Sequence, residues 1–232
     1  ILLLANIHPA VTGFCPGKSV SDNARVHLGR KNVLKVDLHD FFPSIRSPRV
    51  RAAFREMGYS RPIAKVLAEL CCLRCCLPQG APTSPALSNI IAYPMDKKMM
   101  ALAGEYGLVY TRYADDLTFS GDYLPKDEVL VRIHRIIREE GFTMNVKKTR
   151  FLSEHKRKII TGVSVSSGKK MTLPKVKKRE IRKNVHYVLT KGLVGHQEHI
   201  GSTDPIYLKR LLGSLCYWRS IEPDNRYVSD SI

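Results

Sequence analysis

Three aspartates stand where a strand is expected to end or a hairpin to turn. The stretch YTRYADDLTFSG, residues 110–121, carries Asp115 and Asp116 side by side among residues that prefer strands. The stretch VDLHDFFPS places Asp37 at the end of another expected strand. Adjacent carboxylates repel one another and give up β-propensity, so the pattern indicates a chemical purpose. Because a hairpin projects its turn residues together and a neighbouring strand end can join them, we expect the three carboxylates to converge.

Converging carboxylates are stable together when cations lie between them. Mg²⁺ is a hard cation that combines carboxylates with substrate phosphates. Two such ions about 4 Å apart can activate an attacking hydroxyl and stabilise a leaving pyrophosphate. Two adjacent aspartates without further motifs are also compatible with an ordinary turn, in which aspartate is common. The catalytic interpretation gains weight from Asp37, from the basic chain and from a further motif.

That motif is LPQGAPTSPALSN, residues 77–89. Gly80 allows close backbone approach, and prolines stiffen the loop. Ser84, Ser88 and Asn89 then open an expected helix whose backbone amides could face an anionic ligand. A proline-rich turn before a capped helix is the plainer alternative for any one of these residues, but the whole string is far more specific.

The charge of the chain indicates its partners. The 232 residues include 38 Lys or Arg and 21 Asp or Glu, a net charge of +17. Residues 147–183 hold fourteen of these cations against two acids, and apolar residues interleave with them, so the segment should fold. A folded surface with this density of cations suits a phosphate backbone. No apolar run approaches the roughly 20 residues of a membrane span, so we expect no membrane partner.

Six cysteines include the cluster CCLRCC at residues 71–76. Their i,i+4 spacing could gather thiolates on a helix, but zinc ligand pairs usually lie farther apart on turns. We therefore expect Cys71, Cys72, Cys75 and Cys76 to pack in the core. In a chain of this length the simpler setting is a reducing cytoplasm rather than a disulfide framework.

Hydrophobic spacing predicts mixed elements. Strands are expected at 32–38, 108–113, 117–120 and 158–165. Helices are expected at 48–57, 62–72, 84–102 with a kink at Pro94, 129–140, 174–192 and 207–218. The basic helix 174–192 should bury a stripe of Ile181, Val185, Val188 and Leu189. Because strands and helices mix without strict alternation, the fold class is α+β.

The motifs together resemble those of a known family. DLHDFFPSI, LPQGAPTSP, YADD, GFTMNVKKTRF and ITGVSV occur in the order and at the spacing of reverse transcriptase motifs A to E. The sequence is most similar to the bacterial retron subgroup, because NARVH matches the Asn-Ala-x-x-His of that subgroup. HPAVTGFCPGKSV and LLGSLCYWRSIEPD also resemble retron segments, whereas ITG replaces the usual Val-Thr-Gly.

The resemblance implies a centre with two Mg²⁺ ions held by carboxylates and one backbone carbonyl. The implied ligands are Asp37, Leu38, Asp115 and Asp116. Lys148 matches the motif D lysine that protonates pyrophosphate, with Lys147 as its nearest rival.

The resemblance also implies a nucleotide site. Gln79 and Gly80 would line the incoming nucleotide, and the backbone at Asp40 and Phe41 would meet its triphosphate. Phe42 matches the aromatic steric gate that fills the space of a ribose 2′-hydroxyl and so selects deoxynucleotides. The alternative for Phe42 is a core aromatic, a part that we expect Phe41 to take.

On the nucleic-acid side, Thr161 and Gly162 would form the primer grip and contact the cognate RNA. Asn23 and His27 are subgroup markers for which RNA contact and a structural hydrogen-bonding role both stay open. The basic helix 174–192 is our candidate for gripping RNA or duplex. Its residues expected to face phosphate are Lys175, Lys177, Lys178, Arg179, Arg182 and Lys183.

The fold implied is a right-hand polymerase palm with partial fingers and a C-terminal helical thumb. Residues 1–31 and 48–92 would form fingers and palm helices, 32–47 and 93–168 the palm with its catalytic motifs, and 169–232 the thumb. The fingers would be incomplete at the N-terminus, with residues 1–6 as the tail of a helix. No cation is identified that clamps the triphosphate, although Lys18 lies in the right neighbourhood.

The function implied is an RNA-directed DNA polymerase, a nucleotidyltransferase with a two-metal mechanism. It would copy a cognate retron noncoding RNA into branched multicopy single-stranded DNA, use deoxynucleoside triphosphates, and serve antiphage defence with an effector protein. A group II intron-type reverse transcriptase is one alternative, for which we expect a further domain after the thumb. An RNA polymerase and a polymerase-like RNA-binding scaffold are others, and the intact aspartates argue against the scaffold.

Overall fold

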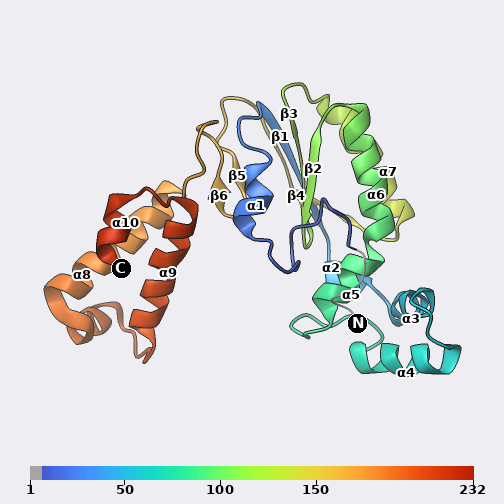
Figure 1. The fold of residues 1–232 in the computed structure, drawn as a ribbon, viewed down its shortest axis with the longest axis horizontal. Coiled ribbons are helices and arrows are strands. Elements are labelled where there is room, and N and C mark those ends of the chain that lie inside the picture. The colour runs from blue at the N-terminus through green and yellow to red at the C-terminus, as the bar shows by residue number, and fades with distance from the viewer. Residues whose placement is uncertain (1–6) are drawn as a thin grey trace.

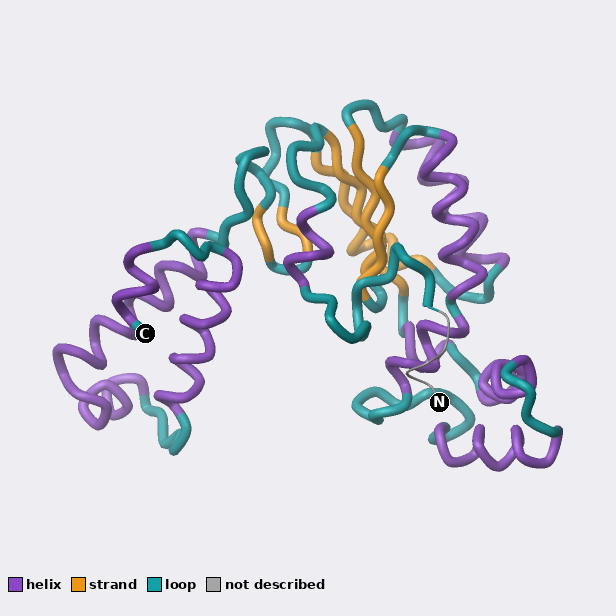
Figure 2. Tube along the Cα trace, in the orientation of Figure 1, coloured by secondary structure: helices purple, strands orange, loops and turns teal. Residues whose placement is uncertain are grey.

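A four-stranded antiparallel sheet forms the centre of the computed structural model, which describes residues 7–232 (Figures 1 and 2). The strands are β1 (Asn32–Leu38), β2 (Val109–Tyr113), β3 (Asp116–Gly121) and β4 (Met144–Leu152). Their order across the sheet is β2-β3-β1-β4, so β1 lies between the β2–β3 hairpin and β4. The expected tail of a helix at residues 1–6 lies outside the described residues.

The predictions for β1, β2 and β3 are confirmed, each within one residue at either end. The edge strand β4 was not predicted. Three consecutive exposed residues in it, Val146, Lys147 and Lys148, break the alternation that identifies a half-buried strand. A register shift between Lys35 and Asp37 accompanies the pairing of β4 with β1.

Ten helices of the described residues surround the sheet and extend from it. They are α1 (Val20–Arg25), α2 (Phe41–Ser44), α3 (Ser47–Glu56), α4 (Arg61–Cys71), α5 (Ser84–Ile91), α6 (Tyr93–Glu105), α7 (Lys126–Glu139), α8 (Lys175–Ile200), α9 (Tyr207–Ile221) and α10 (Arg226–Ser231). The mixture of helices and one antiparallel sheet agrees with the predicted α+β class.

The two faces of the sheet have different coverings (Figure 1). On one face Leu34, Val36 and Phe119 are buried in a large apolar core to which α6 and α7 contribute. Because side chains alternate along a strand, Val33, Lys35 and Asp37 belong to the other face, where α1 packs. Burial of each large apolar side chain contributes about 1.5–3 kcal/mol, so the first face fixes which way the carboxylates face.

The predicted helix 84–102 is two helices. α5 ends at Ile91 and α6 begins at Tyr93, with Pro94 in the first turn of α6. Proline is tolerated in a first turn, where its missing N–H has no partner to lose. α3 and α4 pack on each other and extend away from the sheet beyond α5 (Figure 1).

The C-terminal part has a second apolar core, centred on the fully buried Trp218. The predicted strand 158–165 is a hairpin of β5 (Ile159–Ile160) and β6 (Val163–Ser164), because Thr161 and Gly162 turn with positive φ angles of 45° and 83°. Beyond it, α8, α9 and α10 form a helical unit set apart from the central sheet (Figure 2).

Two details of α8 correct the sequence prediction. The helix does not end at Gly192 but resumes after a single non-helical residue there and reaches Ile200. Ile181 and Val185 are buried as expected, whereas Leu189 is 80% exposed, so the buried stripe is shorter than predicted. The apolar core that α8 shares with α9 and α10 includes Ile181 and Val185 but not Leu189.

The cysteine cluster does not form one helical face. α4 ends at Cys71, and Arg74 and Cys75 have positive φ angles of 51° and 62° in the turn that follows. Cys71 and Cys72 pack against the large core, but Cys75 is exposed, so core packing is confirmed for only part of the cluster. In residues 7–232, no helix combines the length and the apolar composition that crossing a membrane requires.

Candidate active site

The sheet register brings the predicted aspartates together. Asp37 on β1 pairs directly with Asp116 on β3, and Asp115 lies in the two-residue turn between β2 and β3. The backbone N–H of Leu38 donates to the carbonyl of Asp115 at 3.0 Å, which joins the end of β1 to that turn. Directly paired residues have Cβ atoms about 4.5–5.5 Å apart, so changes of side-chain rotamer alone can bring the carboxylates into contact with one ion.

Asp37 is the most enclosed of the three, at 7% exposure. Its Oδ2 accepts a hydrogen bond from Lys148 Nζ at 3.2 Å, while its buried Oδ1 has no partner within the described residues. Lys148 comes from β4, on the opposite side of β1 from β3, so Asp37 lies between a cation and the other carboxylates. This contact distinguishes Lys148 from its rival Lys147.

The electrostatics of the site reflect this arrangement. Burial raises the pKa of Asp115, the negative charges of Asp116 and Asp37 raise it further, and Lys148 lowers it in part. Conversely, the hydrogen bond and the charge of Asp37 raise the pKa of the Lys148 ammonium. Lys148 therefore remains charged, and its charge acts on both Asp37 and Asp115.

The site fits a hard cation, although it is not a preformed cage. Within residues 7–232, no three carboxylate, imidazole or thiol groups already have the spacing of metal ligands. The unpaired oxygen of Asp37 and the mutual repulsion at Asp115 nevertheless leave negative charge uncompensated. Oxygen donors with excess negative charge are the set that Mg²⁺ prefers, so the residues present suit that ion.

The residues predicted to meet the nucleotide follow β1 directly. Asp40, with φ of 46°, begins the short helix α2, and Phe41 is buried in the large core as expected. Phe42 is half-buried, with its ring centroid 5.5 Å from that of Phe41. Phe41 thus takes the core position expected of it, while Phe42 packs against the same core and its role as the gate stays a prediction.

The motif of residues 77–89 forms an exposed turn and the start of α5. Gln79 and Gly80 are exposed, and Gly80 has a φ of 91°, a conformation that favours glycine. Ser84 is buried and donates its hydroxyl to the carbonyl of Pro78 at 2.7 Å, which closes the turn. Lys18 is exposed in the loop before α1.

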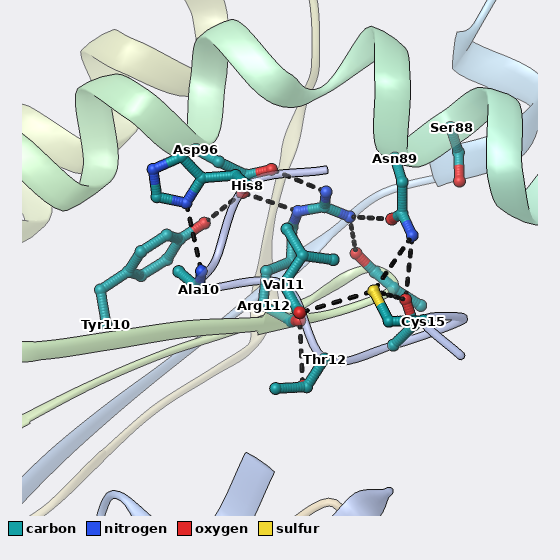
Figure 3. Close-up of polar contacts among 12 residues, drawn as sticks. His8, Ala10, Val11, Thr12, Cys15, Ser88, Asn89, Asp96, Tyr110 and Arg112 are labelled. Carbon is teal, nitrogen blue, oxygen red and sulfur yellow. Dashed lines mark hydrogen bonds and ion pairs between the residues drawn. The ribbon is translucent and has the colours of Figure 1, made fainter. Parts of the chain in front are cut away.

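A buried polar network beside the turn that carries Asp115 was not predicted (Figure 3). Arg112 on β2 donates Nε to Asp96 Oδ1 at 2.8 Å and Nη2 to Asp96 Oδ2 at 2.7 Å. Its Nη1 donates to the Asn89 side chain and to the carbonyl of Ala114, each at 3.1 Å. The guanidinium thus ties the turn that carries Asp115 to both α5 and α6.

One feature of the sequence could have indicated this network. Arg112 is two residues from Tyr110, and both side chains lie on the face of β2 that α6 covers, as strand alternation requires. Arginine on a buried strand face needs a carboxylate partner, but the sequence does not state which acid supplies it. Tyr110 also donates to Asp96, at 2.7 Å.

The structure contradicts the prediction that Asn23 and His27 contact RNA. Both are fully buried. Asn23 accepts from the Thr12 hydroxyl at 2.8 Å, and the His27 ring nitrogens lie 2.6 Å from Ser120 Oγ and 2.8 Å from Thr111 Oγ1. Their side chains secure α1 and the preceding loop to the sheet, which is the structural alternative that the sequence left open.

Thr161 and Gly162 form the exposed turn of the β5–β6 hairpin. The Thr161 hydroxyl donates to the carbonyl of Val20 at 3.1 Å and accepts from Asn23 Nδ2 at 3.4 Å. Gly162 is exposed. The turn is thus held against α1 while the backbone of Gly162 stays accessible.

The basic residues of α8 divide into two groups. Lys178 is corrected, because it is half-buried and faces the helical unit itself. Lys178 pairs with Glu222 at 2.6 Å, and the Arg182 guanidinium lies 5.3 Å from the Trp218 ring and 4.9 Å from that of Tyr227. Arg182 nevertheless remains exposed, as do the other four: Lys175, Lys177, Arg179 and Lys183.

Comparisons with known proteins bear on the whole chain. The family described as reverse transcriptase (RNA-dependent DNA polymerase) matches residues 2–187. The Retron Ec86 reverse transcriptase of Escherichia coli is 39% identical over 194 residues, which cover 83% of this chain and 60% of that protein. The Retron Mx65 reverse transcriptase of Myxococcus xanthus is 36% identical over 238 residues, 94% of this chain and 53% of that protein.

Among solved structures, a telomerase from Candida albicans in complex with a fragment of telomeric RNA is 12% identical, with a TM-score of 0.46. The similarity covers 89% of this chain and 43% of that one, and it is too low to bear on the fold. The chain thus spans 60% and 53% of the lengths of the two retron relatives.

Proposed function

Because the chain belongs to the reverse transcriptase family, we propose that it is an RNA-directed DNA polymerase that extends a primer with deoxynucleotides. The observation that carries the proposal is the direct pairing of Asp37 with Asp116 beside the turn that holds Asp115. In this reaction a primer hydroxyl attacks the α-phosphorus of a deoxynucleoside triphosphate. The new phosphorus–oxygen bond replaces the bond to pyrophosphate, which leaves.

Each residue has a proposed part in this reaction. Asp37, Asp115, Asp116 and the Leu38 carbonyl would hold Mg²⁺, which when bound lowers the pKa of the attacking hydroxyl and neutralises the leaving pyrophosphate. Lys148 would give a proton to the pyrophosphate, a role supported by its charge and its contact with Asp37. Metal binding and proton transfer would thus both serve the same phosphoryl transfer.

The nucleotide would lie against α2 and the loop before α5. The Phe42 ring would exclude a ribose 2′-hydroxyl, while Gln79 and Gly80 line the base and sugar. The backbone at Asp40 and Phe41 would meet the triphosphate.

We assign the sheet with α6 and α7 to the palm (32–47 and 93–168), and residues 1–31 and 48–92 to fingers and palm helices. Residues 169–232 would form the thumb. The exposed cations Lys175, Lys177, Arg179 and Lys183 would contact phosphates, and Thr161 and Gly162 the primer. Binding through phosphates releases counterions, so the affinity for RNA should fall steeply with salt.

We further propose a retron role: copying a cognate noncoding RNA into branched multicopy single-stranded DNA, in antiphage defence with an effector protein. Its support is the identity to retron reverse transcriptases. Sequencing the nucleic acid that copurifies tests it. A short RNA joined to single-stranded DNA is expected, and a product without that branch would contradict the retron role while leaving polymerase activity intact.

The polymerase proposal is tested with the double variant Asp115→Asn, Asp116→Asn. We expect loss of DNA synthesis on a primed RNA template with RNA binding unchanged, because only the metal-binding oxygens are altered. Asp122→Asn, just after the far end of β3, is the matched control and should keep full activity. DNA synthesis by the double variant at the rate of the control would refute the proposal. Loss of RNA binding as well would favour a folding defect, which circular dichroism would detect.

A further inference from the structure

We propose that Phe14 is a positioning residue that holds the Phe42 ring in place and thereby sharpens the choice between deoxyribonucleotides and ribonucleotides. The inference rests on the proposed function, because it deepens the role given to Phe42. Phe14 lies in the loop before α1, far from Phe42 in sequence. No motif used above includes it among its site residues.

The backbone at Phe14 is held in an unusual conformation. Its φ is 60°, a region that bulky residues rarely adopt, and its side chain remains 43% exposed. Residues held in such conformations cluster at functional sites, where the surroundings impose them. Neither burial in the core nor the turn itself therefore explains a phenylalanine at this position.

The surroundings that impose it belong to the catalytic hairpin and to the network around Arg112. The carbonyl of Gly13 accepts a hydrogen bond from Asn89 Nδ2 at 3.0 Å. A Cβ atom at Gly13 would lie 2.6 Å from the backbone nitrogen of Ala114, so the loop is pressed directly against the turn that carries Asp115. Phe14 is consequently fixed relative to the aspartates.

The ring of Phe14 reaches two aromatic neighbours. Its centroid is 6.1 Å from that of Phe42 and 6.3 Å from that of Tyr113, the residue that pairs with Asp116. Phe42 in turn contacts Phe41, which is anchored in the core. Phe42 therefore has one aromatic neighbour in the core and a second, Phe14, at the surface.

A second neighbour matters because a steric gate works only if its ring does not move aside. The discrimination against a 2′-hydroxyl equals the free energy needed to displace the ring. Aromatic pairs at such centroid separations favour one ring arrangement over its alternatives by about 2- to 10-fold in population. Removing Phe14 should therefore lower the sugar selectivity by about this factor, less than removal of Phe42 itself.

The experiment measures kcat/KM for single incorporation of a deoxyribonucleotide and of the matching ribonucleotide on a primed RNA template. Phe14→Ala should lower the ratio of the two by about 2- to 10-fold, and Phe14→Tyr, which keeps the ring, should retain it. Alanine keeps the Cβ atom, so the backbone preference at φ 60° changes little. In a Phe42→Ala background, Phe14→Ala should leave the ratio unchanged, because no gate remains to be held.

Tyr123→Ala serves as the matched control: it removes an exposed aromatic ring just beyond the far end of β3. If Phe42→Ala lowers the ratio of the two kcat/KM values but Phe14→Ala leaves it unchanged, the role proposed for Phe14 is overturned and the gate assignment stands. An equal loss with both sugars would also overturn it, since that is the result of damaged folding or of direct nucleotide contact. If Phe42→Ala itself fails to alter the ratio, the gate assignment in the proposed function fails instead.

Discussion

The buried pair of Arg112 and Asp96 allows a quantitative prediction. Both side chains are fully buried and share two hydrogen bonds, of 2.8 and 2.7 Å. Asp96→Asn preserves the shape but removes the negative charge, so the guanidinium is left buried without a counter-ion. Breaking such a pair from one side costs about 3–5 kcal/mol. Since small proteins are stable by about 5–15 kcal/mol, the loss would be a large share of the total.

The measurement is the free energy of unfolding in urea, followed by far-ultraviolet circular dichroism at pH 7.5. Glu105→Gln is the matched control, because it breaks the ion pair of Glu105 with Arg132, whose side chains are 52% and 39% exposed. Exposed pairs contribute up to about 1 kcal/mol. Adding Arg112→Met to Asp96→Asn should restore part of the lost stability, because it removes the unpaired charge. A cost for Asp96→Asn no larger than that of the control would refute the assigned role of the pair.

Two further predictions concern single positions. Burial, and to a lesser degree Arg30, lower the pKa of His27 from 6.5 to about 3, so its folded form stays neutral while the unfolded form gains a proton below pH 6.5. The buried His27 therefore lowers the free energy of unfolding by about 2 kcal/mol between neutral pH and pH 5. In urea unfolding at pH 7.5 and 5, the free energy of unfolding of His27→Gln should fall by about 2 kcal/mol less than that of the unsubstituted protein. An equal fall in both proteins would contradict a neutral imidazole. Gly13→Ala should destabilise the protein by about 1–3 kcal/mol, because the added Cβ would meet backbone atoms. Gly213 is exposed within α9 and has nothing near the position of a Cβ, so Gly213→Ala should stabilise the protein by about 0.5–1 kcal/mol. Thermal unfolding of the two variants checks the opposite signs, and equal shifts would show that the close approach at Gly13 is not constraining.

Local features of the sequence were sufficient for the centre of the sheet. β1, β2 and β3 are short runs whose β-propensity and flanking turns mark them without reference to the rest of the chain. Phe41 was likewise assigned to the core. The helix break near Pro94 was anticipated as a kink, and the structure makes it a full separation of α5 from α6.

Errors arose where an element depends on its neighbours. β4 is an exposed edge strand that exists because β1 offers it backbone partners, which its own residues do not reveal. Lys178 is a cation on a basic helix, and only the positions of Glu222 and Trp218 turn it inward.

The sequence by itself determined that Asp115 lies in a turn, and it was enough to predict which carboxylates would bind a cation and that the partner would be polyanionic. These follow from residue types and short spacings, which local physics controls. Only the tertiary structure decided that Asp37 pairs with Asp116, that Arg112 finds Asp96, that His27 is enclosed, and that Phe14 meets Phe42. The reason is that strand register and the burial of polar groups depend on contacts between residues distant in the chain, and no local pattern records which partners meet.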